Sequence, residues 1–244
     1  MNGVDDYRSR VTAEDLVSTR VRLRETDLLI RGERDLEQPA REALKRYRRE
    51  IEDYLFRHPE WGRSLVPVPA GEEAPPIAAA MSRAASVCGV GPMAAVAGAL
   101  AWFVGRALSS FSGELIVENG GDIFINSRRD RTVLVGTGLN SEFPGYLGIR
   151  IAGGLEPVGV AASSGSGGRS LSWGRAEAAV VLAEDTIVAD AAATALGNRI
   201  RASGRETIEA AVGAIADIPG VKGCLTVCEN ILAVRGDLEL ADLS

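Results

Sequence analysis

The chain has 244 residues, of which 46% are hydrophobic, so it is long and apolar enough to bury a core. Its formal net charge of -6 argues against a broad electrostatic footprint for nucleic acid, and we expect no nucleic-acid partner. Three cysteines are too few for the disulfide framework of a small secreted domain, so reduced thiols are expected.

The N-terminal ten residues, MNGVDDYRSR, carry acids and arginines where an export signal needs an apolar core. We therefore expect a cytoplasmic protein. From Ala84 to Gly105 no side chain is charged, and a stretch of that length could cross a bilayer. Gly91-Pro92 interrupts the stretch, and alanine and glycine dominate it, which favours a buried pair of helices over a membrane partner.

The first predicted elements are a hairpin and a long helix. Residues 18–31 alternate apolar and charged side chains in two runs, which predicts a β-hairpin. One face of it would carry three arginines, either solvated or binding an anion: Arg20, Arg22 and Arg24. Residues 36–56 place apolar side chains at helical spacing, and His58-Pro59 ends this helix.

Residues 65–77 concentrate prolines and predict a connection, not an element. The chain, residues 1–244, is expected to form a single domain with a lobe boundary near this connection. The elements predicted after it are helices at 77–90 and 93–109, strands at 114–126, 131–136, 146–152 and 176–183, helices at 185–201 and 206–218, and a final hairpin turning at Glu229-Asn230. Strands and helices mix without a regular βαβ repeat, which favours α+β with mixed antiparallel sheets.

The helix at 185–201 carries the first candidate site. Asp185 or Thr186 stands where an N-cap would accept free amide hydrogens. Asp190 and Thr194 are four residues apart, so they share a face and offer two hard oxygen ligands for magnesium or calcium. The alternative is that Asp190 complements the helix dipole and Thr194 bonds its own preceding turn.

Two glycine-rich segments offer backbone amides to an anion. The loop that includes Ser163, Ser164 and Gly165 has small side chains that let a ligand approach the backbone, although a plain turn would have the same composition. The segment Asn119-Gly120-Gly121-Asp122 lies between two β-branched runs and is typical of a hairpin turn. A turn of this kind can also present amides to a ligand.

At these residues the sequence resembles the ApbE superfamily, the FAD:protein FMN transferases. The matching residues are Ser163-Ser164-Gly165, Asn119-Gly120-Gly121 and Ala189-Asp190 with Thr194, in family order. The resemblance implies a two-lobed, T-fold-like architecture, metal binding by Asp190 and Thr194, and a flavin nucleotide pocket. The pocket residues it implies are Asn119, Gly120, Gly121, Asp122, Ser163, Ser164 and Gly165, to which Arg169 is added as a phosphate ligand. The overall likeness is to a shorter branch of that superfamily, not to its transferases.

Two departures separate this chain from the transferases. Their alanine-lysine-glycine segment corresponds to Val96-Ala97-Gly98 here, which has no lysine. Their histidine-rich segment corresponds to residues 169–173 here, which contain no histidine, and Arg169 cannot accept a proton at working pH.

The expected function is therefore metal-dependent binding of FAD, with FMN transfer or FAD diphosphate hydrolysis as the chemistry and Mg²⁺ or Ca²⁺ as the ion. The alternative is a non-catalytic binding protein for FAD or another phosphorylated small ligand. P-loop, HExxH and CxxC motifs are absent from the sequence. Apolar hairpin edges leave a homo-oligomer open, and the sequence identifies no acceptor protein.

Overall fold

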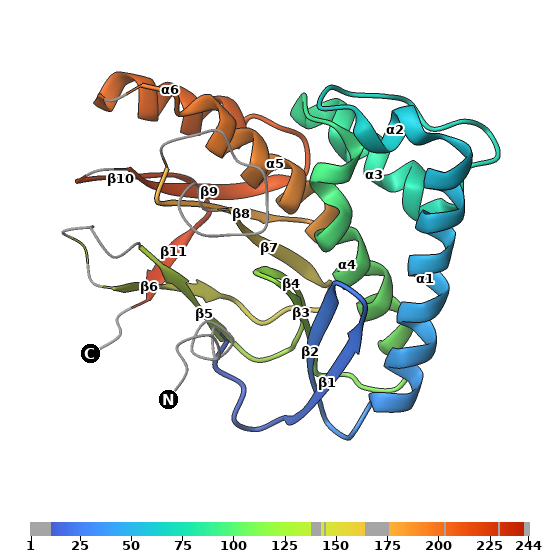
Figure 1. The fold of residues 1–244 in the computed structure, drawn as a ribbon. Helices are drawn as coiled ribbons and strands as arrows, with labels where there is room; N and C mark the ends of the chain where they lie inside the picture. Colours follow the sequence, from blue (N-terminus) through green and yellow to red (C-terminus); the bar gives the residue numbers. More distant parts are fainter. Residues whose placement is uncertain are drawn as a thin grey trace.

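The computed structural model describes residues 11–137, 143, 145–163, 176–202, 204–228 and 230–241. These residues form three layers (Figure 1): a layer of helices, an eight-stranded sheet and a three-stranded sheet. Within the described residues, neighbouring strands of both sheets pair antiparallel. The α+β prediction with mixed antiparallel sheets is confirmed.

The large sheet has the order β1-β2-β3-β4-β7-β8-β9-β10. Its strands are β1 (Val17–Leu23), β2 (Thr26–Gly32), β3 (Leu115–Asn119), β4 (Asp122–Asn126), β7 (Val158–Ser163), β8 (Ala178–Ala183), β9 (Val221–Cys228) and β10 (Ile231–Gly236). The final hairpin turns between β9 and β10, as predicted from Glu229-Asn230. The small sheet has the order β11-β6-β5, with β5 (Arg131–Gly136), β6 (Tyr146–Ile151) and β11 (Glu239–Ala241).

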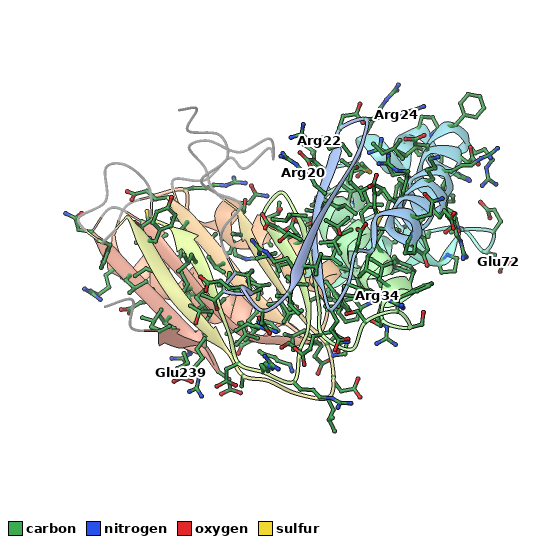
Figure 2. All side chains as sticks on the ribbon, turned by 90° about the horizontal axis from the view of Figure 1, so that it is seen from below. Arg20, Arg22, Arg24, Arg34, Glu72 and Glu239 are labelled. Carbon is green, nitrogen blue, oxygen red and sulfur yellow. The ribbon has the colours of Figure 1, made fainter. Side chains whose placement is uncertain are left out.

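The predicted N-terminal hairpin is present as β1 and β2. The register pairs Leu23 with Thr26 and leaves a two-residue turn in which Arg24 has φ of 52°. Figure 2 labels the three arginines along this hairpin, and two of them, Arg20 and Arg22, donate to the carboxylate of Asp27. The one negative charge of Asp27 therefore offsets part of their positive charge within the hairpin.

The helical layer contains α1 (Glu37–Arg57), α2 (Pro59–Arg63), α3 (Pro76–Cys88), the 3-10 helix η2 (Pro92–Ala95), α4 (Val96–Leu108), α5 (Thr186–Arg199) and α6 (Arg205–Ala216). The predicted helices are all present, and α2 was not predicted.

In the described part of the chain no single helix has the length and apolarity to cross a membrane. The bent pair α3 and η2–α4, with 106° between its halves, passes that test by length and composition alone.

Two hydrophobic clusters lie on the two faces of the large sheet. Alternate strand residues, such as Val117 and Val181, face the helices, while their neighbours, such as Ile116 and Val180, face the small sheet. Both clusters contain residues from before and after the connection at 65–77, which joins α2 to α3. The helix-facing side of the large sheet is where the candidate site lies.

One strand of the large sheet differs from its prediction. Ser163 was expected in a glycine-rich loop, but it is the last residue of β7, which pairs with β4 and β8. The residues of β7 are mostly small, and small residues have low β-propensity, so the pattern indicated a loop. The strand contains a glycine, Gly159, because α5 packs against it too closely for a side chain: a Cβ there would lie 2.2 Å from the amide nitrogen of Thr186.

Candidate functional site

The site is organised by α5, which begins beside Gly159 and runs over β7 and β8 in the direction of β7. Thr194 is eight residues into the helix, about 12 Å from its start at 1.5 Å per residue. Ser163 is four residues beyond Gly159, about 13 Å along the strand at 3.3 Å per residue. The two residues therefore reach the same end of the sheet.

The N-terminus of α5 is capped by Asp185, one of the two residues predicted for that role. Its carboxylate accepts a hydrogen bond of 2.7 Å from the amide of Val188. Burial raises the pKa of Asp185 above its usual value, while the amide hydrogen bonds oppose that shift. The capping carboxylate fixes the start of α5 and hence the position of Asp190 one turn later.

Asp190 points at the N-terminus of α4. Its Oδ2 accepts a 2.8 Å hydrogen bond from the amide of Gly98, and the carboxylate also accepts from the amide of Ala97. These are the second and third residues of α4, whose amides have no partner inside their own helix. The sequence alternative assigned Asp190 to the dipole of its own helix, whereas the structure places it at the positive end of another.

The carboxylate of Asp190 is desolvated although the residue as a whole is half-buried. Desolvation raises its pKa from the usual 3.8 to about 7, against the effect of the two amide hydrogen bonds. A carboxyl group with a strongly raised pKa beside a helix terminus is a common property of functional sites, and also of some structural ones.

Gly98 is required by the contact between α4 and α5. A Cβ at this position would lie 2.2 Å from the carbonyl oxygen of Thr186 and 2.7 Å from Cβ of Asp190. The segment Val96-Ala97-Gly98 is thus the segment that Asp190 contacts.

Asn119 joins the same group from the large sheet. Its side-chain amide donates a 3.0 Å hydrogen bond to the carbonyl of Ala97, and it lies opposite Asp122 in the β3–β4 register. Both residues are buried, and the turn between them uses φ of 69° at Gly120 and 116° at Gly121. The predicted turn is present, and both of its glycines adopt the positive φ that a side chain disfavours.

The structure thus brings three sequence segments together: the start of α4, the turn after β3 and the Asp190 face of α5. Ser163 lies at the same end of the sheet, 6% exposed, and its hydroxyl has no hydrogen-bond partner among the described residues. Thr194 is half-buried one turn beyond Asp190. The other three predicted residues lie outside the described residues: Ser164, Gly165 and Arg169.

The donor set suits a magnesium-type ion and not a closed protein cage. In the described ranges no three His, Cys, Asp or Glu side chains gather to hold a metal. Magnesium is commonly held by one or two carboxylates together with substrate phosphates. A carboxylate has about four lone-pair sites, so two remain on Asp190 after its two amide contacts.

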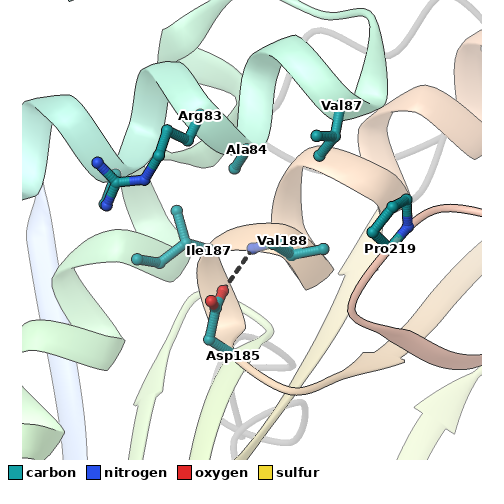
Figure 3. A pocket seen from close by; sticks show the side chains of 8 residues that line it. Arg83, Ala84, Val87, Asp185, Ile187, Val188 and Pro219 are labelled. Carbon is teal, nitrogen blue, oxygen red and sulfur yellow. Dashed lines mark hydrogen bonds between the residues drawn. The ribbon is translucent and has the colours of Figure 1, made fainter.

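Two cavities among the described residues lie away from the group around Asp190. One of about 180 Å³ lies between α3 and the start of α5 (Figure 3), lined by Arg83, Asp185 and apolar side chains. Ligand pockets generally have 300–1,000 Å³. The other, of about 310 Å³, lies between the β1–β2 turn and α1, and the ion pair between Arg24 of the turn and Glu52 of α1 crosses it.

Sequence reasoning missed two contributors: the amides of Ala97 and Gly98. The available signal was a glycine within an apolar helix, which is destabilising unless the backbone must be approached closely. The glycine indicated that another part of the chain approaches Gly98 closely. It did not indicate which part, because Asp190 is 92 residues away in the chain.

Comparison with known proteins supports the fold and identifies the family. The family model described as AbpE bacteria matches residues 8–217. The UPF0280 protein of Methanopyrus kandleri is 39% identical over 226 residues, which cover 91% of this chain and 88% of that protein. The UPF0280 protein of Methanosarcina barkeri is 36% identical over 200 residues, which cover 82% of this chain and 78% of that protein.

Two solved structures share the fold at low sequence identity. The flavin transferase ApbE from Vibrio cholerae has a TM-score of 0.60 and 12% identity, covering 90% of this chain and 96% of that one. The flavinyl transferase ApbE of Pseudomonas stutzeri, in its apo form, has a TM-score of 0.57 and 13% identity, covering 90% and 93%. The chain therefore belongs to the ApbE family, together with the UPF0280 proteins that it resembles over most of their length.

Proposed function

We propose that the protein binds FAD through its diphosphate, with a divalent cation held by Asp190 and Thr194, and that it transfers FMN or hydrolyses the diphosphate. The observation that carries this proposal is the position of Asp190: its desolvated carboxylate lies against the free amides of α4, beside Asn119. The family and the fold support a flavin-related activity.

In this proposal each group has a distinct task. Asp190 would bind the cation that contacts the diphosphate, and Thr194 would add a second oxygen ligand one turn further along α5. The turn from Asn119 to Asp122 and the hydroxyl of Ser163 bind the nucleotide, as do Ser164, Gly165 and Arg169 in the segment that follows. Mg²⁺ bound here would neutralise the diphosphate charge and polarise the phosphorus that is attacked.

In the chemical step the P–O bond of the diphosphate bridge breaks and AMP leaves. The FMN phosphorus forms a new bond to a hydroxyl of an acceptor protein, or to water, which gives free FMN. The proton of the attacking hydroxyl must be taken up by a base. The single histidine of the chain, His58, lies at the end of α1 with its Nε2 2.8 Å from Glu73 and is not part of this group.

The absence of a histidine from this group favours a second candidate function. The segment at α4 carries no lysine, and the one histidine is engaged at the end of α1, so the chain lacks two groups that the transferases have. A protein that binds FAD with its cation but leaves the diphosphate intact would fit the same pocket residues.

Incubation of the purified protein with FAD and Mg²⁺ tests these alternatives. Formation of FMN and AMP, or of a flavinylated acceptor, supports catalysis, and it should disappear in Asp190→Ala but persist in Asp217→Ala, which removes an exposed carboxylate at the end of α6. Magnesium-dependent binding of intact FAD supports the binding protein. Absence of FAD binding with and without Mg²⁺ contradicts both.

A further inference from the structure

Thr186, the first residue of α5, has a buried hydroxyl without a partner. The residue is 0% exposed, and its Oγ1 has no hydrogen bond within the described residues. A helical threonine usually bonds the carbonyl four residues earlier. For Thr186 that residue is Leu182, which belongs to β8 and not to the helix, so the usual acceptor is not in helical position.

The hydroxyl is exceptional among the buried threonines of the described chain. Thr19 donates to Asp35 at 2.8 Å, and Thr226 donates to the carbonyl of Ala178 at 2.8 Å. Thr26 accepts from Arg48, and Thr137 has an interaction of its own. A buried hydroxyl without a partner is destabilising, whereas valine would fill the same shape without that cost. The presence of threonine here requires a reason other than packing.

The position of Thr186 supplies the reason. It lies four residues before Asp190, so the two side chains occupy the same face of α5 with Cβ atoms about 5–6 Å apart. Gly98 of α4 approaches both: its Cβ position is 2.2 Å from the Thr186 carbonyl and 2.7 Å from Cβ of Asp190. Thr186, Asp190 and Thr194 therefore form a row of three oxygen-bearing side chains on successive turns.

We propose that Thr186 is a positioning residue for the cation site, whose hydroxyl donates a hydrogen bond to the Asp190 carboxylate when that carboxylate holds the ion. This inference rests on the proposed function. The two α4 amides and one hydroxyl occupy three of the four lone-pair sites of the carboxylate and leave the fourth to the cation. Partners of this kind orient a ligating carboxylate, and their loss commonly weakens metal affinity 10–100-fold.

Mn²⁺ binding by Thr186→Val and Thr186→Ser tests the inference. Free Mn²⁺ is followed by electron paramagnetic resonance, alone and with FAD, and the melting temperature is measured without metal. We expect Thr186→Val to melt at a higher temperature than the parent protein and to bind Mn²⁺ roughly tenfold more weakly. Thr186→Ser keeps the hydroxyl and should bind within about twofold of the parent.

Thr226→Val is the matched control, because it removes a fully buried hydroxyl that does have a partner. It should melt at a lower temperature and leave Mn²⁺ affinity unchanged. If Thr186→Val binds Mn²⁺ as the parent does, or if Thr186→Ser is as weak as Thr186→Val, the role of Thr186 is refuted while the proposed function stands. If the parent binds no Mn²⁺ under either condition, both are refuted.

Discussion

The carboxylate of Asp190 on α5 accepts a 2.8 Å hydrogen bond from the amide of Gly98 on α4. The two residues lie 92 positions apart in the chain, so the contact joins helices that are distant in sequence. It also places a negative side chain at the positive end of a helix. It also removes the carboxylate from solvent, which raises its pKa to about 7. The structural cap of α4 and the proposed cation binding therefore depend on the same oxygen atoms.

The raised pKa predicts that the metal-free protein loses stability as pH rises. The folded state binds the Asp190 proton more tightly than the unfolded state, so the contribution is complete below the unfolded pKa of 3.8 and is lost as pH rises through about 7. Because the residue keeps some exposure, we expect the free energy of unfolding to change by on the order of 2 kcal/mol, which is less than the full pKa shift would give.

Urea unfolding at pH 5 and pH 8, without divalent ions, measures this effect. The difference between the two pH values should shrink in Asp190→Asn, which cannot ionise but still offers an oxygen to the α4 amides. Comparing the two proteins at both pH values cancels the contributions of other carboxyl groups. An equal pH dependence in both proteins would show that Asp190 does not titrate in this range.

Substitution of Gly98 by alanine should destabilise the protein by about 1–3 kcal/mol, because the added methyl group overlaps the Thr186 carbonyl and Cβ of Asp190. Gly213 provides the control: it also lies within a helix, α6, and a Cβ there meets nothing within 4 Å. Gly213→Ala should instead stabilise by about 0.5–1 kcal/mol. Chemical denaturation of the two variants measures both signs, and destabilisation of similar size in each would contradict the close α4–α5 contact.

Arg131 is predicted to hold the small sheet to the rest of the fold. Its side chain is 4% exposed and donates to Asp15, Ser127 and Glu114, the last at 3.0 Å. Arg131→Met removes the charge, which leaves Glu114 without its cation and Asp15 with only the exposed Arg129, so we expect a loss of about 2–4 kcal/mol.

Arg150 is the matched control for Arg131. It pairs with Asp130 and Glu239 in the same small sheet, but its side chain is 47% exposed. Arg150→Met should cost less than about 1 kcal/mol, as exposed ion pairs do. Thermal unfolding should therefore show a clearly lower melting temperature for Arg131→Met than for Arg150→Met. Equal losses of stability would show that the buried ion pairs of Arg131 contribute no more than the exposed pairs of Arg150.

Much of the fold follows from local pattern. The alternation at 18–31 predicted β1 and β2, and the run at 131–136 predicted the bounds of β5. The start of α5 was predicted because Asp185 is a strong capping residue in front of an alanine-rich helix. Local signals of this kind suffice where an element's own residues determine it.

Other features depend on contacts that local pattern does not encode. β7 was missed because its small residues are selected by the approach of α5 to Gly159, not by strand propensity. β11 is a three-residue strand that exists through pairing with β6, which lies 89 residues earlier at the Glu239–Arg150 pair. The same limit applies to the site: spacing placed Asp190 and Thr194 on one face but could not reveal that Ala97 and Gly98 face Asp190.

The most direct test of the central claim is the location of a bound cation. A crystal of the protein grown with FAD and Mn²⁺ should show a Mn²⁺ anomalous peak about 2.0–2.3 Å from an Asp190 carboxylate oxygen and from the Thr194 hydroxyl. The FAD diphosphate should complete its coordination. A Mn²⁺ peak at another site, or bound FAD with no ion beside Asp190, would contradict the account.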